Sequence, residues 1–445
     1  MHPPAWSGVD GGLARVLADP WVLVQALLSR AGAWAQTWGP ATATAGIAAG
    51  GVLIGLRWWW RTRCRRALHE RARLVTILAP PEVDADSAEA MWANLVGLVR
   101  PVMQRLTGGQ PHVAWEFVFG QHGVQIRLWV PGTVPPGMVE HAVEAAWPGA
   151  HTRTTEASPP VPAPAAGQRR LVTGGTLRLA RSEALPLRTT FDTDPLRGLL
   201  GAPVGLSRDE TACVQLLARP VTGRRVQSAR RAARRLDAGH AARLPSRLLD
   251  LITPGAHSRT TRSTSTTRDP QTSLALQAQN RAIVGKQRGG QWETRLRYAV
   301  AATVPADTPP AQLARIRDQL RGRAHALASA YAAFTEHNHL RRRRLRRPAE
   351  ALQQRRLHRG DLLSVPELAA LAHVPTDQNV PGLARAGARA LPPPPATPAT
   401  GELVRPIGVS DAANPARSGC RSPTPATTCT CSARPGRASP RSWPG

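Results

Sequence analysis

Hydrophobic and polar positions first set apart a long N-terminal stretch that carries no charge. Residues 31–56 contain no charged side chain, and 41–60 (ATATAGIAAGGVLIGLRWWW) form a segment of about twenty residues. At about 1.5 Å per residue such a helix matches a hydrocarbon core of about 30 Å. The sequence therefore predicts a transmembrane helix over 41–60. The expected membrane-interface residues are an arginine that snorkels, an aromatic belt and the basic residues after it: Arg57, Trp58, Trp59, Trp60, Arg61 and Arg63.

The arginines that follow the apolar segment predict its orientation. Because positive charge gathers on the cytoplasmic side, we expect a single-pass protein of the cytoplasmic membrane with its C-terminal bulk in the cytoplasm. A buried helix of a soluble protein is the alternative for this Ala- and Gly-rich stretch. Residues 1–40 are predicted to be an amphipathic, interfacial segment, and 16–38 are alternatively a second membrane segment.

The next region, 61–157, alternates strand and helix patterns in a recognisable order. A β-rich run at 73–83 precedes a capping-box pair, Asp86 and Glu89, that predicts a helix. Period-two alternation at 113–119 and 124–130 predicts a hairpin, followed by a helix at 138–147 and a strand at 150–155. This βαββαβ order predicts a ferredoxin-like α+β domain. Its aromatic residues form either a core face, which the alternation favours, or a base-stacking platform: Trp115, Phe117 and Phe119.

A second α+β region is predicted at 176–375, after a Pro/Ala linker at 158–175. Strand patterns at 176–181, 211–221 and 295–300 accompany an arginine-rich helix and a long helix after Pro310. A Ser/Thr-rich insert near 254–271 is expected to be disordered. The expected fold class is α+β: a transmembrane helix, the ferredoxin-like domain, a second α+β region with long basic helices, and a disordered C-terminal tail.

Charge adds a class of partner to this picture. Lys and Arg total 58 against 29 Asp and Glu, which gives a formal net charge of +29. That excess favours DNA phosphates or anionic lipids as partners, whereas a solvated basic surface without a ligand is the alternative. The densest cluster is LRRRRLRR at 340–347, which we expect to contact nucleic acid or lipid unless it is only a solvated helix face. Its candidate contact residues are Arg341, Arg342, Arg343, Arg344, Arg346 and Arg347.

Motifs for catalysis are not found in this sequence. A phosphate-binding loop needs a lysine after a glycine-rich turn, and Lys286, the only lysine, lacks the first glycine and is followed by Gln287. The five cysteines form no C-x-x-C pair, and no nucleophile elbow or H-E-x-x-H pair occurs. We therefore expect no catalytic residue, no cofactor, no metal site and no small-molecule substrate.

The C-terminal part changes character after a linker at 376–411. From 412 to 445 the chain is rich in Arg, Ser, Pro and Thr without apolar periodicity, and it predicts a disordered tail. Reverse translation of 432–445 in a shifted frame permits G-A-T-G-S-G-K-S-T-L-L-A-G, a complete phosphate-binding loop. We interpret 412–445 as out-of-frame sequence, and 376–411 as a linker and entry to a missing motor domain.

Several segments together carry a family resemblance: RWWWRTRCRR, HVAWEFVFG, GVQIRLWVPG, LLSVPELAALAHVP and RPIGVSD. With the latent loop, the chain resembles the N-terminal part of actinobacterial type IV secretory, conjugative DNA-transfer proteins of the coupling-protein and FtsK/HerA-like kind. The resemblance implies membrane-anchored hexameric ATPases that pump DNA, here without the motor. It implies as partners the cytoplasmic membrane, DNA, and transfer-apparatus proteins or an intact homologous ATPase. The alternative is a stand-alone, membrane-tethered basic DNA-binding or scaffold protein.

Overall fold

The computed structural model describes residues 20–121, 123–237, 270–377, 380, 382–386, 404–409 and 417–421. The start of the segment 1–40, most of the insert near 254–271, and the largest part of 387–445 lie outside the described residues. The described residues fall into two compact units: those within 1–71 and 100–110, and those within 72–99 and 111–445.

The first unit is built on one long helix. Helix α2 (Pro20–His69) includes the whole of the predicted segment 41–60, and α4 (Val102–Gly108) packs against it. Trp58 and Trp59 are exposed, as are most apolar residues of 47–56. Within the described part of the chain, no helix combines the length and the apolar character that a membrane crossing requires.

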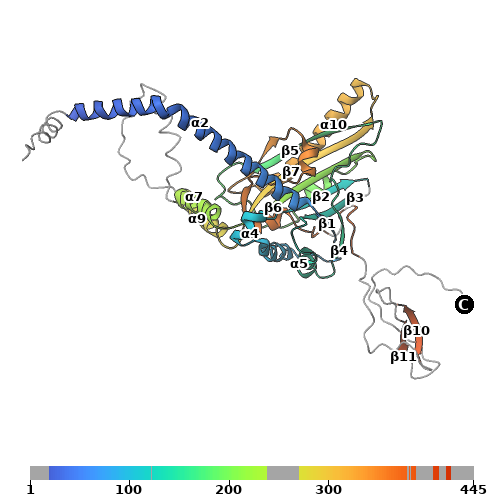
Figure 1. Cartoon of the computed structure of the whole chain (residues 1–445). Helices are drawn as coiled ribbons and strands as arrows, with labels where there is room; N and C mark the ends of the chain where they lie inside the picture. The colour runs from blue at the N-terminus through green and yellow to red at the C-terminus, as the bar shows by residue number, and fades with distance from the viewer. Residues whose placement is uncertain are drawn as a thin grey trace, which may run out of the picture. The chain divides into compact units, whose positions relative to one another are not determined.

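The second unit contains a nine-stranded, antiparallel sheet (Figure 1). Its first half follows the element order that the sequence predicted for 61–157, and its strands lie in the order β4-β1-β3-β2. The elements are β1 (Arg73–Leu78), α3 (Ser87–Asn94), the 3₁₀ turn η1 (Leu95–Leu98), β2 (Val113–Gly120), β3 (Gly123–Val130), α5 (Met138–Ala146) and β4 (His151–Glu156).

The second half repeats the same order of strands and helices, with β9 added beside β7. Its elements are β5 (Gln168–Leu179), α6 (Arg197–Gly201), β6 (Glu210–Val221), α7 (Arg224–Asp237), α9 (Pro270–Lys286), β7 (Gln291–Pro305), α10 (Pro310–Ser329), η3 (Ala330–Phe334), β8 (Leu340–Arg344), α11 (Pro348–Gln353), β9 (Asp361–Ser364) and α12 (Val365–Leu371). The main difference lies between β6 and β7. The matching strands β2 and β3 are joined by a tight turn, whereas here α7, α9 and residues 238–269 intervene.

The two halves join through β2 and β6, so the full order is β4-β1-β3-β2-β6-β7-β5-β8. The junction is antiparallel, with Val113 opposite Ala218 and Phe119 opposite Ala212, so the equivalent strands β2 and β6 meet in the middle of the sheet and the two halves are related by an approximate two-fold rotation. The sequence predicted two separate regions with a linker at 158–175. Instead they share one sheet. Strands β2 and β6 would each be a free edge if the halves were separate, and in the joined sheet their backbone N–H and C=O groups pair with each other. Strand β5 also begins within the predicted linker, at Gln168.

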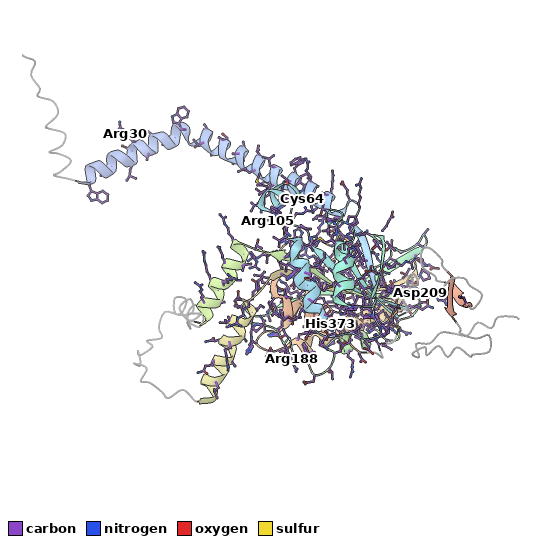
Figure 2. The ribbon with its side chains drawn as sticks, turned by 90° about the horizontal axis from the view of Figure 1, so that it is seen from below. Arg30, Cys64, Arg105, Arg188, Asp209 and His373 are labelled. Atoms are coloured by element: carbon purple, nitrogen blue, oxygen red, sulfur yellow. The ribbon has the colours of Figure 1, made fainter. Side chains whose placement is uncertain are left out.

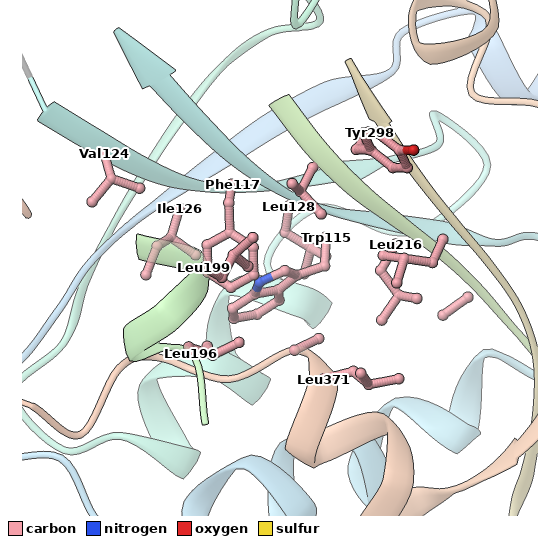
Figure 3. Packing of buried hydrophobic residues seen from close by; sticks show 14 of the residues in the cluster. Trp115, Phe117, Val124, Ile126, Leu128, Leu196, Leu199, Leu216, Tyr298 and Leu371 are labelled. Carbon is pink, nitrogen blue, oxygen red and sulfur yellow. The ribbon is translucent and has the colours of Figure 1, made fainter. Parts of the chain in front are cut away.

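The core lies between the sheet and the helices of one face. Trp115, Phe117 and Leu216 point into the same cluster as Leu199 of α6 and Leu371 of α12 (Figure 3). The aromatic face of β2 is almost fully buried, with Phe119 only 3 % exposed. The core-face interpretation is thus confirmed, and a base-stacking platform on β2 is excluded. The opposite face of the sheet is covered in part by α11, through Leu352.

Two local expectations are not met. The alternative of a solvated helix face for 340–347 is wrong: Leu340–Arg344 form edge strand β8, which pairs with β5. A run of arginine has no apolar period, so the pairing with β5 decides its conformation. Asp86 precedes α3 but its side chain makes no capping bond, whereas the capping box of Ser364 and Glu367 is present.

The tail predicted to be disordered contains a strand. Residues 417–421 form β11 (Arg417–Arg421), which pairs with β10 (Val404–Val409) in a separate two-stranded sheet. The pairing uses backbone groups, which the side-chain pattern of this Arg- and Ser-rich stretch does not signal.

Candidate nucleic-acid interface

The two equivalent halves of the sheet differ most at their outer edges. Strand β1 has six residues, all paired with the edge strand β4, whereas its counterpart β5 has twelve. Edge strand β8 pairs only with residues 175–179 of β5. Among the described strands, none pairs with the outer side of 168–174. The longer strand thus leaves an open step at the edge of the second half.

A cleft of about 660 Å³ occupies this step. Its floor is the uncovered part of β5, and its walls are α10 and the chain that follows β8. Volumes of this size are usual for ligand sites. Six arginines from three separate segments line it: Arg169, Arg170, Arg317, Arg321, Arg344 and Arg346.

The lining residues of the cleft include no carboxylate. Several arginines elsewhere in this unit are paired with carboxylates, as Arg178 is with Asp361 at 2.7 Å and Arg73 with Glu140 at 3.0 Å. In the cleft only Arg321 has an ion pair among the described residues, with Asp318 one turn away, and both side chains are about 70 % exposed. Such an exposed pair contributes little and is easily exchanged for another anion. The cleft therefore concentrates positive charge that the described residues do not neutralise.

The structure separates the arginines of 340–347 that the sequence proposed as one contact surface. Arg344 and Arg346 line the cleft. Arg342 lies on the same side of β8, where it donates to the Tyr298 hydroxyl at 3.1 Å and contacts His325 of α10. Arg341 and Arg343 alternate with it and face the other side of the sheet.

Arg347 points to neither group of arginines. It pairs with Glu350 at 3.4 Å on the exposed surface. The clustering of 340–347 in sequence therefore does not make one binding surface.

Sequence reasoning missed four of the six cleft arginines: Arg169, Arg170, Arg317 and Arg321. The spacing of Arg317 and Arg321 places both on one face of a helix, which was the one available signal. Nothing local links them to Arg169, because the pairing of β5 and the packing of α10 bring these segments together.

The predicted membrane-interface residues lie together on α2. The Arg63 guanidinium sits 5.5 Å above the Trp59 ring, and the Trp60 indole donates to the carbonyl of Leu106 on α4. Arg57, Arg61 and Arg63 are exposed. The aromatic and basic residues therefore lie within about two turns of α2, and all of them except the half-buried Trp60 are exposed.

Two buried ionisable pairs in the sheet unit, Lys286 with Glu367 and Asp194 with His373, have a structural role. Lys286 donates to Glu367 at 2.9 Å and to the Leu185 carbonyl, with both charged side chains at most 1 % exposed. Burial alone would raise the pKa of Asp194. The hydrogen bond and charge of His373, with the backbone N–H groups of Leu196 and Thr376, outweigh burial and lower that pKa to about 2. Among the described residues, no group of three or more His, Cys, Asp or Glu side chains could hold a metal ion.

Comparison with curated proteins gives no match. Among solved structures, the crystal structure of CrmK, a flavoenzyme involved in the shunt product recycling mechanism in caerulomycin biosynthesis, is similar at 11 % identity and a TM-score of 0.23. The match covers 59 % of this chain but only 42 % of that one. A likeness this weak carries no argument about fold or activity. A family model described as "Domain of unknown function (DUF8128)" matches residues 64–381, which include every strand from β1 to β9. The chain therefore belongs to the DUF8128 family.

Proposed function

We propose that this protein is a membrane-associated, DNA-binding adaptor of a conjugative DNA-transfer machine. The observation that carries the DNA contact is the cleft beside β5, where six arginines converge without a lining carboxylate. Phosphate oxygens are the usual partners of such arginines, and the charge of a duplex repeats along its axis. Arg342 continues the basic surface beyond the cleft, which favours a polymer over a single small anion.

Membrane association rests on the first unit. Helix α2 exposes large apolar side chains, among them Ile47, Leu53 and Ile54, and then a group of tryptophans and arginines. In this proposal the apolar stretch lies in the cytoplasmic membrane and the sheet unit faces the cytoplasm. The resemblance of the sequence to coupling-type proteins supports the place in conjugation.

The proposed adaptor does not hydrolyse ATP itself. Lys286, the only lysine, is held in a buried ion pair and cannot reach a phosphate without breaking it. ATP turnover would come from a partner ATPase of the transfer apparatus. A stand-alone tethered DNA-binding protein is the alternative, and it uses the same two surfaces without that partner. Cross-linking in cells to a transfer ATPase distinguishes the two.

The DNA contact is tested with the full chain and a fluorescent duplex, by measuring affinity across a range of salt concentration. Each phosphate contact contributes about 0.9 to the slope of log affinity against log salt. Arg317→Gln combined with Arg321→Gln is expected to reduce that slope by about 2. A matched control, Arg153→Gln with Arg359→Gln, removes the same charge from exposed positions outside the lining of the cleft. Equal slopes for the two double variants would reject the cleft as the DNA site.

A further inference from the structure

A short excursion of the chain leaves the sheet unit and joins the long helix. Residues 100–110, between α3 and β2, belong to the first unit together with α2. The excursion is closed at its base, because the Arg100 N–H donates to the Gln110 side chain at 3.1 Å and its guanidinium to the Gly109 carbonyl. The second half of the sheet has no described counterpart between β5 and β6. The sheet itself therefore does not need this segment.

Helix α4, within this excursion, is fixed to α2. The Trp60 indole donates to the Leu106 carbonyl, and the Cys64 thiol contacts the Thr107 carbonyl. Gly109 has a φ of +72° and lies against Cys64, where an added Cβ would meet the Cys64 Cβ at 3.4 Å. Figure 2 shows Cys64 and Arg105 close together where the two helices meet. The excursion is thus held in one place on the helix.

The side of α4 that faces away from these contacts is apolar. Val102, Met103 and Leu106 are 60 %, 72 % and 61 % exposed. On α2, Leu53 and Leu56 follow the same helical face as Trp60 and Cys64, and both are also exposed. Two neighbouring helices therefore present one apolar surface that no described residue covers.

The charge around this surface indicates what covers it. Residues 20–71 and 100–110 contain nine arginines and one acidic residue, Glu70. Arg57, Arg61 and Arg105 lie among the apolar residues on the two helices. Apolar side chains within a dense ring of positive charge match the interface of an anionic bilayer, where acyl chains lie just below phosphate groups. A protein partner would instead need an acidic surface that complements these arginines.

We propose that α4 inserts into the interface of an anionic membrane beside α2, with Val102, Met103 and Leu106 among the acyl chains. It is a second, shallow attachment point that holds the C-terminal part of α2 at the level of the lipid headgroups. This inference rests on the membrane association proposed above and adds the element that makes the contact.

Insertion is tested with an environment-sensitive fluorophore on Met103→Cys in the full chain, with Cys420, Cys429 and Cys431 replaced by serine. Cys64 and Cys213 are buried and are left in place. Vesicles of phosphatidylcholine and phosphatidylglycerol in equal parts should shift the emission to the blue. Ile54→Cys reports on α2, and Val204→Cys, which is 70 % exposed in the sheet unit, should not respond.

The three probes separate this inference from the proposed function. A response at 54 without one at 103 overturns the role of α4 and leaves membrane association standing. No response at either position overturns both. A response at 103 that equals the one at 204 also rejects the inference, because contact would then be unspecific.

A second measurement uses the unlabelled chain. Replacing Val102, Met103 and Leu106 together by serine is expected to weaken partitioning into the same vesicles about tenfold or more. The matched control replaces Val204, Leu274 and Val284, which are comparably exposed outside the first unit. Equal partitioning of the two triple variants would contradict the insertion of α4.

Discussion

Glu116 of β2 and Gln215 of β6 are direct cross-strand partners at the junction of the two halves, and the Gln215 amide donates to the Glu116 carboxylate at 2.8 Å. The same carboxylate accepts two hydrogen bonds from Arg355, at 2.7 and 3.0 Å. All three side chains are buried. A single ionic group thus joins the strands of both halves to the chain that crosses the opposite face of the sheet.

Arg355→Met should destabilise the sheet unit strongly. The substitution leaves the Glu116 carboxylate buried without its cation, which typically costs about 3–5 kcal/mol. The free energy of unfolding from denaturant titration measures the loss. Arg359→Met, at an exposed arginine four residues later, serves as the control and should change stability by no more than about 0.5 kcal/mol.

Lys286→Met tests whether the only lysine has a structural role. The Glu367 carboxylate would lose its buried partner, so we expect a loss of about 3–5 kcal/mol. Arg347→Met breaks the surface pair with Glu350, where both side chains are more than half exposed, and should cost less than about 1 kcal/mol. Similar losses for the two variants would show that burial of the first pair does not control its contribution.

The lowered pKa of Asp194 predicts that the folded protein loses stability in acid. Its pKa is lowered in the folded protein from 3.8 to about 2, so the folded state favours the ionised form. The resulting stabilisation is complete above pH 4 and is lost as the pH falls towards about 2. It amounts to about 2 kcal/mol. Unfolding measured across this range should show the loss, and Asp194→Asn should remove that part of the pH dependence. Asp318→Asn, at an exposed carboxylate, should leave the profile unchanged.

The arginines of 340–347 should not contribute equally to DNA binding. Arg341 and Arg343 face away from α10, whereas Arg344 and Arg346 line the cleft. Neutralising Arg344 and Arg346 to glutamine should therefore reduce the salt slope by about 2, and neutralising Arg341 and Arg343 should reduce it less. Identical slopes would mean that total charge, and not the cleft, governs binding. The cleft variant should still associate with anionic vesicles, because those contacts lie in the first unit.

Local pattern predicted the elements of the first half well. The alternation of β2 and β3 and the spacing of α5 are set by which residues face the core, and both appear in the structure. The partnership of β2 with β6 was not foreseen. It joins residues about a hundred positions apart, and either strand would have looked the same with its outer edge in water.

The candidate site was foreseen only in part for the same reason. Arg344 and Arg346 belong to a conspicuous run, but their neighbours in space come from β5 and α10. For the arginine run, a solvated helix face was only the alternative to a contact surface, because the run carries no period of its own. Its extended conformation follows from hydrogen bonding to β5, which no property of 340–347 alone specifies.

The unequal lengths of β1 and β5 have a consequence for how such a protein changes over generations. The two halves share the β2–β6 junction, but their outer edges are independent of each other. In the short copy, β1 is paired with β4 along its whole length, so most substitutions there affect the stability of the fold and not a ligand site. In the long copy, residues 168–174 pair with β7 on one side and with no described strand on the other, so ligand preference can change along that outer side while the β2–β6 junction stays intact.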